Sequence, residues 1–345
     1  MIDPHVHLRG EEYSTNYMEL GFRDAIRSGL LAIIEQPNPT PQILTADIGA
    51  ERLKRGNKYR GNIVHRFHIG ITNDENQVRQ ALESVMKREH GLISDKIFYV
   101  HSTADMGILD QDFQRRIWQI KAEIGYKGVS IGHFEDELLF VKEYDPNDPI
   151  THSQRQNPES ELIQVERQIR NAVDAGFEGI FYVAHASNPY TVYFLNGIKD
   201  KVPFEIAIEV TWHHMFLNTN DYEIHRNRVK MNPPLCSPKM QEKLLECVVS
   251  GQTHTAGSDH APHPLERKDD PAKPASGIPG IPFSPKGIEL LREAGIREQV
   301  LEDITFNNAN RIFNMGLVNK KEEARYDPIL WEAYGYNPFS RIDSS

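Results

Sequence analysis

Two histidines stand two residues apart near the start of the chain, in the stretch DPHVHLRG at residues 3–10. In a β-strand, side chains at positions i, i+2 and i+4 point to the same face. The pattern therefore predicts one face that carries Asp3, His5, His7 and Arg9. If these groups are buried, a metal ion would satisfy the imidazoles and an anionic ligand would satisfy the guanidinium. The alternative is a solvated edge strand whose histidines bind nothing.

Other side chains with similar chemistry follow other short apolar runs. His133 stands in GHFEDE, His185 in AHAS, Asp259 and His263 in GSDHAPH, and Asn38 in QPNPTP. Each has a simpler explanation on its own: Asp before a loop commonly caps a turn or helix, and a lone histidine is often a buried residue bonded to the backbone. Their repeated occurrence at the same end of successive apolar runs favours a shared site.

Eight short apolar segments alternate with amphipathic ones, which predicts an α/β fold of the (β/α)₈ TIM-barrel type. In such barrels the active site lies at the carboxyl ends of the strands. Lys96 opens the fourth expected strand, where a solvated lysine is the simplest interpretation. The expected strands are 2–8, 30–36, 64–71, 96–100, 128–133, 179–185, 204–210 and 253–259, and the expected helices include 15–28, 76–89, 110–124, 160–175, 238–249 and 285–294.

Length and composition narrow the protein class. We expect the 345 residues to form a single barrel domain over 1–345, with a polar tail from about 320 to 345 and little or no accessory β-sandwich. A net charge of −10 argues against nucleic-acid binding. Two cysteines, Cys236 and Cys247, are too few for a disulfide framework, which favours the cytoplasm. No apolar run approaches the roughly 20 residues that span a bilayer, so we expect no membrane segment.

Two segments are expected to be loops. The polar stretch 143–158 is expected at the surface. The stretch 264–284 is long, rich in Pro and Gly, and follows the last expected strand. Loops of this length are usually functional or mobile, and the sequence leaves open whether this one closes over a substrate.

Taken together, the motifs resemble the dihydroorotases of the amidohydrolase superfamily, which are metal-dependent cyclic amidases. The resemblance spans nearly the whole chain, with the motifs in the family's order. HxH alone is weak, but its combination with LR, PN, KIF and SDHAPH is specific. The motifs are DPHVHLRG (3–10), QPNPTP (36–41), KIFYVHST (96–103), GHFEDE (132–137), VAHAS (183–187), KMNPPL (230–235), GSDHAPH (257–263) and GIPG (277–280).

The resemblance implies two Zn²⁺ ions per subunit. One would be held by His5, His7 and Asp259, the other by His133 and His185, and Lys96, carboxylated by CO₂ to N6-carboxylysine, would bridge both. The reaction implied is the reversible interconversion of L-dihydroorotate and N-carbamoyl-L-aspartate in de novo pyrimidine biosynthesis. A metal-bridging hydroxide would attack the amide, with Asp259 as general base and then general acid. The substrate would be bound by Arg9, Asn38, His263 and Asn232.

The chain departs from the family pattern in two places. Arg9 is followed by Gly-Glu-Glu, and Cys236 stands where many relatives have Arg. These departures bear on the substrate more than on the metal, so three alternatives stay open: a dihydropyrimidinase, hydantoinase or allantoinase acting on an uncharged ring, a mononuclear deaminase, and a catalytically silent barrel. The expected partner is a small-molecule substrate, with a homodimer implied by the resemblance.

Overall fold

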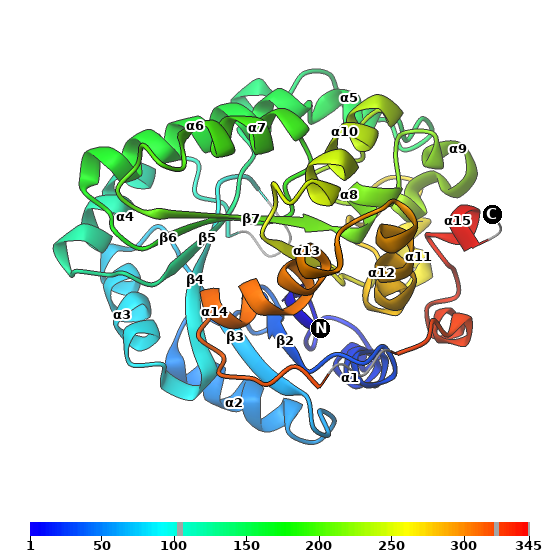
Figure 1. The fold of residues 1–345 in the computed structure, drawn as a ribbon, viewed down its shortest axis with the longest axis horizontal. Helices are drawn as coiled ribbons and strands as arrows, with labels where there is room; N and C mark the ends of the chain where they lie inside the picture. Colours follow the sequence, from blue (N-terminus) through cyan, green and yellow to red (C-terminus); the bar gives the residue numbers. More distant parts are fainter. Residues whose placement is uncertain (102–105, 321–323, 344–345) are drawn as a thin grey trace.

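The computed structural model describes residues 1–101, 106–320 and 324–343. Eight parallel strands lie in sequence order around a barrel, which confirms the predicted (β/α)₈ fold, and helices surround the strands (Figure 1). Each strand is almost entirely buried, as expected where helices cover a parallel sheet. The strands are β1 (Ile2–Val6), β2 (Ala32–Glu35), β3 (Val64–Gly70), β4 (Leu92–Phe98), β5 (Val129–His133), β6 (Ile180–Val183), β7 (Glu205–Thr211) and β8 (Thr255–Gly257).

The longer helices match the amphipathic segments predicted from the sequence. Several begin at a side chain that caps the first turn, such as Asp74 before α3 and Asp110 before α4. The helices are α1 (Tyr17–Arg27), α2 (Ala46–Gly56), α3 (Glu75–Met86), α4 (Gln111–Glu123), α5 (Thr151–Arg155), α6 (Pro158–Ala175), α7 (Pro189–Ile198), α8 (Trp212–Phe216), α9 (Asp221–His225), α10 (Pro238–Val249), α11 (Leu265–Lys268), α12 (Ser284–Glu293), α13 (Glu298–Glu302), α14 (Asn308–Ile312) and α15 (Ser340–Asp343).

All eight expected strands are present, but the start of the fourth was predicted wrongly. Lys96 does not open this strand, because β4 begins at Leu92. Ser94 and Asp95, which lie before the expected strand 96–100, are both buried, and Asp95 accepts a hydrogen bond from Lys121 Nζ at 2.7 Å. Lys96 therefore lies inside the strand, with a side chain that is 0% exposed.

The first strand is shorter than predicted. β1 ends at Val6, so the alternation of faces does not extend to Arg9. Asp3 also does not join the histidines, because its Oδ1 accepts hydrogen bonds from the backbone N–H groups of His5 and Ser258, both at 3.1 Å. Asp3 is therefore satisfied by backbone donors, and the potential ligand atoms that come together are those of His5, His7 and Asp259.

The two expected loops are more ordered than predicted. Within 143–158, helix α5 forms and His152 is buried, so this stretch is not a simple surface loop. Within 264–284, α11 and the short 3₁₀ helix Ile281–Phe283 form. The intervening chain follows the wall of the barrel mouth.

The C-terminal tail, which the sequence predicts to be polar, packs against the barrel over the part of 320–345 that the structure describes. This segment contains the 3₁₀ helix Pro328–Tyr334 and buries several large side chains against the barrel. The ring of Phe339 stacks on Phe283 at a centroid distance of 3.8 Å. Residues 321–323, 344–345 and the Ser-Thr pair at 102–103, which ends the KIFYVHST motif, lie outside the described residues.

The two ends of the barrel differ. At the amino ends of the strands, Phe306, Ala309 and Phe313 join the apolar cluster inside the barrel and fill it. Between the first and last strands the pairing is sparse: Val6 pairs with His260 as an isolated bridge, and His7 N–H donates to the His260 carbonyl at 2.7 Å. No helix among the described residues has both the length and the apolar character to cross a membrane.

We expect Phe339→Ala to lower the free energy of unfolding by about 3–5 kcal/mol, because truncating a fully buried Phe removes burial and leaves a cavity. Urea denaturation followed by far-UV circular dichroism measures this loss. Ile329→Ala in the same tail is the control, since Ile329 is 53% exposed and should change the free energy little. Equal, small effects of both substitutions would contradict the packed tail.

Candidate active site

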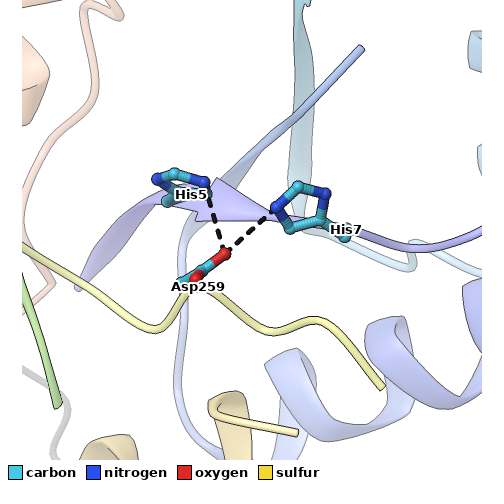
Figure 2. Close-up of side chains that lie close together, drawn as sticks. All are labelled: His5, His7 and Asp259. Carbon is cyan, nitrogen blue, oxygen red and sulfur yellow. Dashed lines mark ion pairs between the residues drawn. The ribbon is translucent and has the colours of Figure 1, made fainter. Parts of the chain in front are cut away.

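Three of the predicted metal ligands meet at one point at the mouth of the barrel. Asp259 Oδ1 lies 3.3 Å from His5 Nε2 and 3.0 Å from His7 Nε2. Figure 2 shows both imidazoles, from β1 and the residue just after it, facing the carboxylate that follows β8. The potential ligand atoms of these three residues all lie within 4.8 Å of one another.

Both histidines are held so that their lone pairs face Asp259. His5 Nδ1 donates to Glu209 Oε1 at 2.7 Å, and His7 Nδ1 donates to Asn38 Oδ1 at 2.6 Å. With the ring proton on Nδ1, each Nε2 carries a lone pair. Two nitrogen lone pairs and a carboxylate oxygen at these distances repel one another unless a cation lies between them. This arrangement fits a metal ion.

The second predicted ligand pair lies beside the first. The ring centroids of His5 and His185 are 5.1 Å apart, and those of His185 and His133 are 4.5 Å apart. His133 Nε2 donates to Glu135 Oε2 at 2.7 Å, which leaves its Nδ1 as the lone-pair nitrogen. His185 Nδ1 is buried with no hydrogen-bond partner among the described residues.

Lys96 is unusual because its Nζ is buried and makes no hydrogen bond to any described residue. It lies 5.1 Å from the ring centroid of Phe98, which lines the pocket. Burial lowers the pKa of Lys96 to about 8, against the opposing attraction of Glu209 and Asp259. A buried amine without a partner is costly, so its chemistry fits a modified or ligand-bound state better than a free ammonium.

Burial also sets the protonation of the other ligands. It lowers the pKa of His7 to about 4 and that of His133 to about 3, so both imidazoles are neutral at neutral pH. Burial raises the pKa of Asp259, but positive charge at His5 and His7 lowers it far below its usual value, and a cation bound between them would have the same effect. Neutral imidazoles with an ionised carboxylate are the forms that bind a divalent cation.

Three candidate site residues adopt left-handed backbone conformations: Arg9 at φ 55°, His185 at φ 38° and Asp259 at φ 42°. Such angles are unfavourable for residues with a Cβ and occur mostly where a site demands them. The N–H of His185 donates to Glu209 Oε1 at 3.0 Å, and the Arg9 carbonyl accepts a hydrogen bond from Arg52. These bonds hold two of the three in place.

Arg9 is buried at the same mouth as the histidines. Its Nε donates to the Pro262 carbonyl at 2.9 Å, and its Nη2 lies 2.8 Å from His263 Nε2, which is also 2.7 Å from the Ser276 carbonyl. Tyr13 Oη lies 2.6 Å from His263 Nδ1 and holds the far side of that ring. Among the described residues, no carboxylate lies within ion-pair distance of the Arg9 guanidinium, so this buried cation has only neutral partners.

The loop after β1, where the sequence departs from the dihydroorotase pattern, is hydrogen-bonded to the loop after β2. Glu12 Oε2 accepts hydrogen bonds from the N–H groups of Gly10 at 2.8 Å and Thr40 at 3.1 Å. A Cβ on Gly10 would lie 2.0 Å from the Thr40 carbonyl oxygen, so this close approach requires glycine. The departure therefore serves to hold the loop beside Asn38.

These residues surround one open pocket at the mouth of the barrel. His263 contacts Arg9 from behind this lining, and Lys96 lies buried near it. Asn232 lines the pocket, and its Oδ1 lies 3.0 Å from His152 Nε2. The predicted residues in the lining are His5, His7, Arg9, Asn38, His133, His185, Asn232 and Asp259.

Sequence reasoning missed the carboxylates that orient the histidines. Glu209 lies on β7 and accepts hydrogen bonds from His5, from the His185 backbone and, at 2.8 Å, from Tyr182 Oη. Glu135 performs the same task for His133. A signal existed for Glu209, because it is a charged residue inside the otherwise apolar segment IAIEV.

Comparisons with known proteins agree with this geometry. No family model matches the chain. The dihydroorotase of Halobacterium salinarum is 28% identical, over 91% of this chain and 71% of the relative. The dihydroorotase of Methanosphaera stadtmanae is 29% identical, over 99% of this chain and 80% of the relative.

Solved structures show the same fold. The dihydropyrimidinase of Brevibacillus agri superposes with a TM-score of 0.76 at 22% identity, covering 94% of this chain and 72% of its own. The dihydroorotase of Saccharomyces cerevisiae in complex with 5-fluoroorotic acid superposes with a TM-score of 0.74 at 20% identity, covering 94% of this chain and 85% of its own.

The fold and the relatives together define the class: an amidohydrolase-type barrel enzyme, a hydrolase of cyclic amides. Within that class, the resemblance to dihydroorotases that the motifs predicted is confirmed over most of the chain. A metal cofactor is consistent with both the relatives and the His5–His7–Asp259 cluster.

We expect Glu209→Gln to weaken metal binding by about 10- to 100-fold, because carboxylates that orient ligand histidines typically contribute this much. Competition with a chromogenic chelator, together with metal content by mass spectrometry, measures the change. Glu205→Gln on the same strand is the matched control, since Glu205 is exposed and pairs with Arg311. Equal metal affinity of both variants would show that Glu209 does not orient the site.

Proposed function

We propose that this chain is a zinc-dependent dihydroorotase that interconverts L-dihydroorotate and N-carbamoyl-L-aspartate in de novo pyrimidine biosynthesis. The observation that carries the proposal is Arg9, a buried guanidinium with only neutral partners at the mouth that also holds His5, His7 and Asp259. A buried charge without a counter-ion is costly, and a substrate carboxylate would supply one. Dihydroorotate has such a carboxylate, whereas dihydrouracil and allantoin do not.

In this proposal His5, His7 and Asp259 hold one zinc ion, and His133 and His185 hold a second. Lys96, as a carbamate formed with CO₂, would supply anionic oxygen ligands to this centre. The modification suits the buried Nζ, because it replaces an unpartnered amine with a group that has ligands to bind. When bound, the two ions would supply a polarising charge and an activated hydroxide at neutral pH.

The protein's own groups would divide the remaining work. Arg9, with Asn38, Asn232 and His263 nearby, would bind the substrate carboxylate and ring and present the amide to the ligand cluster. The carboxylate of Asp259 would accept the proton of the attacking water and return it to the ring nitrogen as the C–N bond breaks. In the opposite direction the same carboxylate would remove the proton from that nitrogen as the ring closes.

A turnover assay tests the proposal directly. With zinc and bicarbonate supplied, we expect hydrolysis of L-dihydroorotate and little turnover of dihydrouracil or allantoin, because only the first has a carboxylate for Arg9. Arg9→Met should raise KM for dihydroorotate by roughly 10- to 100-fold, the range expected for losing a hydrogen bond to a charged group, with metal content unchanged.

Turnover of an uncharged ring in preference to dihydroorotate would favour the dihydropyrimidinase, hydantoinase or allantoinase alternative, and it would remove the carboxylate-binding role from Arg9. Metal binding without turnover of any of the three would favour the silent barrel. Structural neighbours of the chain include hydantoinases, so the alternative of an uncharged ring substrate belongs in the same assay.

We expect Lys96→Ala to lose turnover by roughly 10³-fold and to retain less metal, because the anionic ligand shared by the two ions disappears. Acetate or propionate should restore part of both by occupying the vacated space. Lys87→Ala, at an exposed lysine before the same strand, is the control. Normal turnover of the Lys96 variant without added carboxylate would exclude the carbamate.

The cytoplasmic location, the homodimer and the single-domain organisation over 1–345 stay predictions. Two buried free cysteines, Cys236 and Cys247, support the first. Sedimentation velocity on the purified chain tests the second.

A further inference from the structure

Lys268, the last residue of α11, is a buried lysine with an unusual set of partners. Its side chain is 0% exposed. Its Nζ donates to the carbonyl oxygens of Lys230 at 2.9 Å, Ala275 at 2.9 Å and Gly277 at 2.8 Å. A lysine ammonium has three N–H donors, so all three are used on main-chain acceptors.

The three carbonyls belong to two stretches of chain that form one wall of the pocket. Met231 and Asn232 come from the first stretch, and Ser276 and Gly277 come from the second. The two stretches also bond directly, since Gly277 N–H donates to the Lys230 carbonyl at 2.9 Å. Lys268 itself stands behind this wall and does not line the pocket.

A second lysine joins the same two stretches. Lys230 Nζ donates to the Pro274 carbonyl at 3.1 Å and to Ser276 Oγ at 2.6 Å. The wall also approaches Arg9: a Cβ on Gly277, whose φ is 125°, would lie 3.2 Å from Arg9 Nη2. A displacement of this wall would therefore alter the surroundings of Arg9.

A buried ammonium is costly, and no carboxylate among the described residues lies within ion-pair distance of Lys268 Nζ. Burial, together with the positive charges of Lys230 and Arg9, lowers the pKa of Lys268, while three carbonyl oxygens within 2.9 Å favour its charged form. Replacing the lysine by an apolar residue would leave three buried carbonyls without this donor.

We propose that Lys268 is a positioning residue that binds the 274–278 stretch to the 230–232 stretch, so that the long 264–284 loop is a fixed wall of the substrate pocket and not a moving lid. In its reference to dihydroorotate, the inference rests on the proposed function. Its physical content is preorganisation: Asn232, Ser276 and Gly277 meet the substrate in a geometry that is already set.

The test combines amide hydrogen exchange with steady-state kinetics on the metal-loaded Lys268→Met variant. We expect the Gly277 amide to exchange at least about tenfold faster, with exchange in β4 unchanged. KM for dihydroorotate should rise about tenfold while kcat changes less than about threefold and metal content stays constant. Lys273→Met is the matched control, an exposed lysine in the same loop, and should behave as wild type.

Unchanged exchange at 275–278, or faster exchange there without a rise in KM, would overturn the proposal. A fall in metal content with faster exchange throughout the barrel would also overturn it, because it indicates general destabilisation. If Lys268→Met does not fold, Lys268→Gln, which keeps two N–H donors on a shorter side chain, must show the same rise in KM. Failure of the wild type to hydrolyse dihydroorotate would refute the proposed function, and the exchange measurement would still decide whether the wall is fixed by Lys268.

Discussion

The site depends on one electrostatic constraint: two imidazole lone pairs and a carboxylate oxygen are held facing one another at 3.0–3.3 Å. This arrangement is unfavourable without a cation, so other parts of the barrel must enforce it. Glu209 fixes the ring of His5 and the left-handed backbone of His185 with one oxygen, and Asn38 fixes the ring of His7. Because these supports lie on β7 and after β2, whereas the histidines lie on or after β1 and β6, the cluster keeps its shape only while the barrel is intact.

The pocket is also polarised. Glu209 and Asp259 lie beside the histidines, while the buried Arg9 and Lys268 and the half-buried Lys230 lie at or behind the wall that contains Ser276 and Gly277. The three cations interact with one another, and their hydrogen bonds go to neutral acceptors. A substrate with an anionic end and a neutral amide would be oriented by this field before any specific contact forms.

The sequence was sufficient to predict the eight strands because buried parallel strands are short apolar runs between Gly, Pro and Asn, and their order follows the chain. It also predicted the histidines and Asp259, since residue type and strand end together limit their chemistry. It failed where a polar group is satisfied by a distant partner. The expected fourth strand left out Asp95, because the partner of this carboxylate, Lys121, is 26 residues away, and the sequence does not show that Glu209 bonds to His5, 204 residues away. Phe339 lies in a polar tail without periodicity, so its burial depends on tertiary packing alone.

The sparse pairing between the first strand and the segment after the last gives the proposed metal a mechanical role. Val6 and His260 form only an isolated bridge there, yet His5 and His7 lie on one side of this junction and Asp259 on the other. An ion held by these three residues would link the two sides of this sparsely paired junction. Its binding energy would then contribute to closure of the barrel. Removal of the ion by a chelator should therefore weaken the barrel first at the junction between β1 and the segment after β8. Metal binding would be a late event in folding, because it requires these two segments, from opposite ends of the barrel sequence, to be in contact.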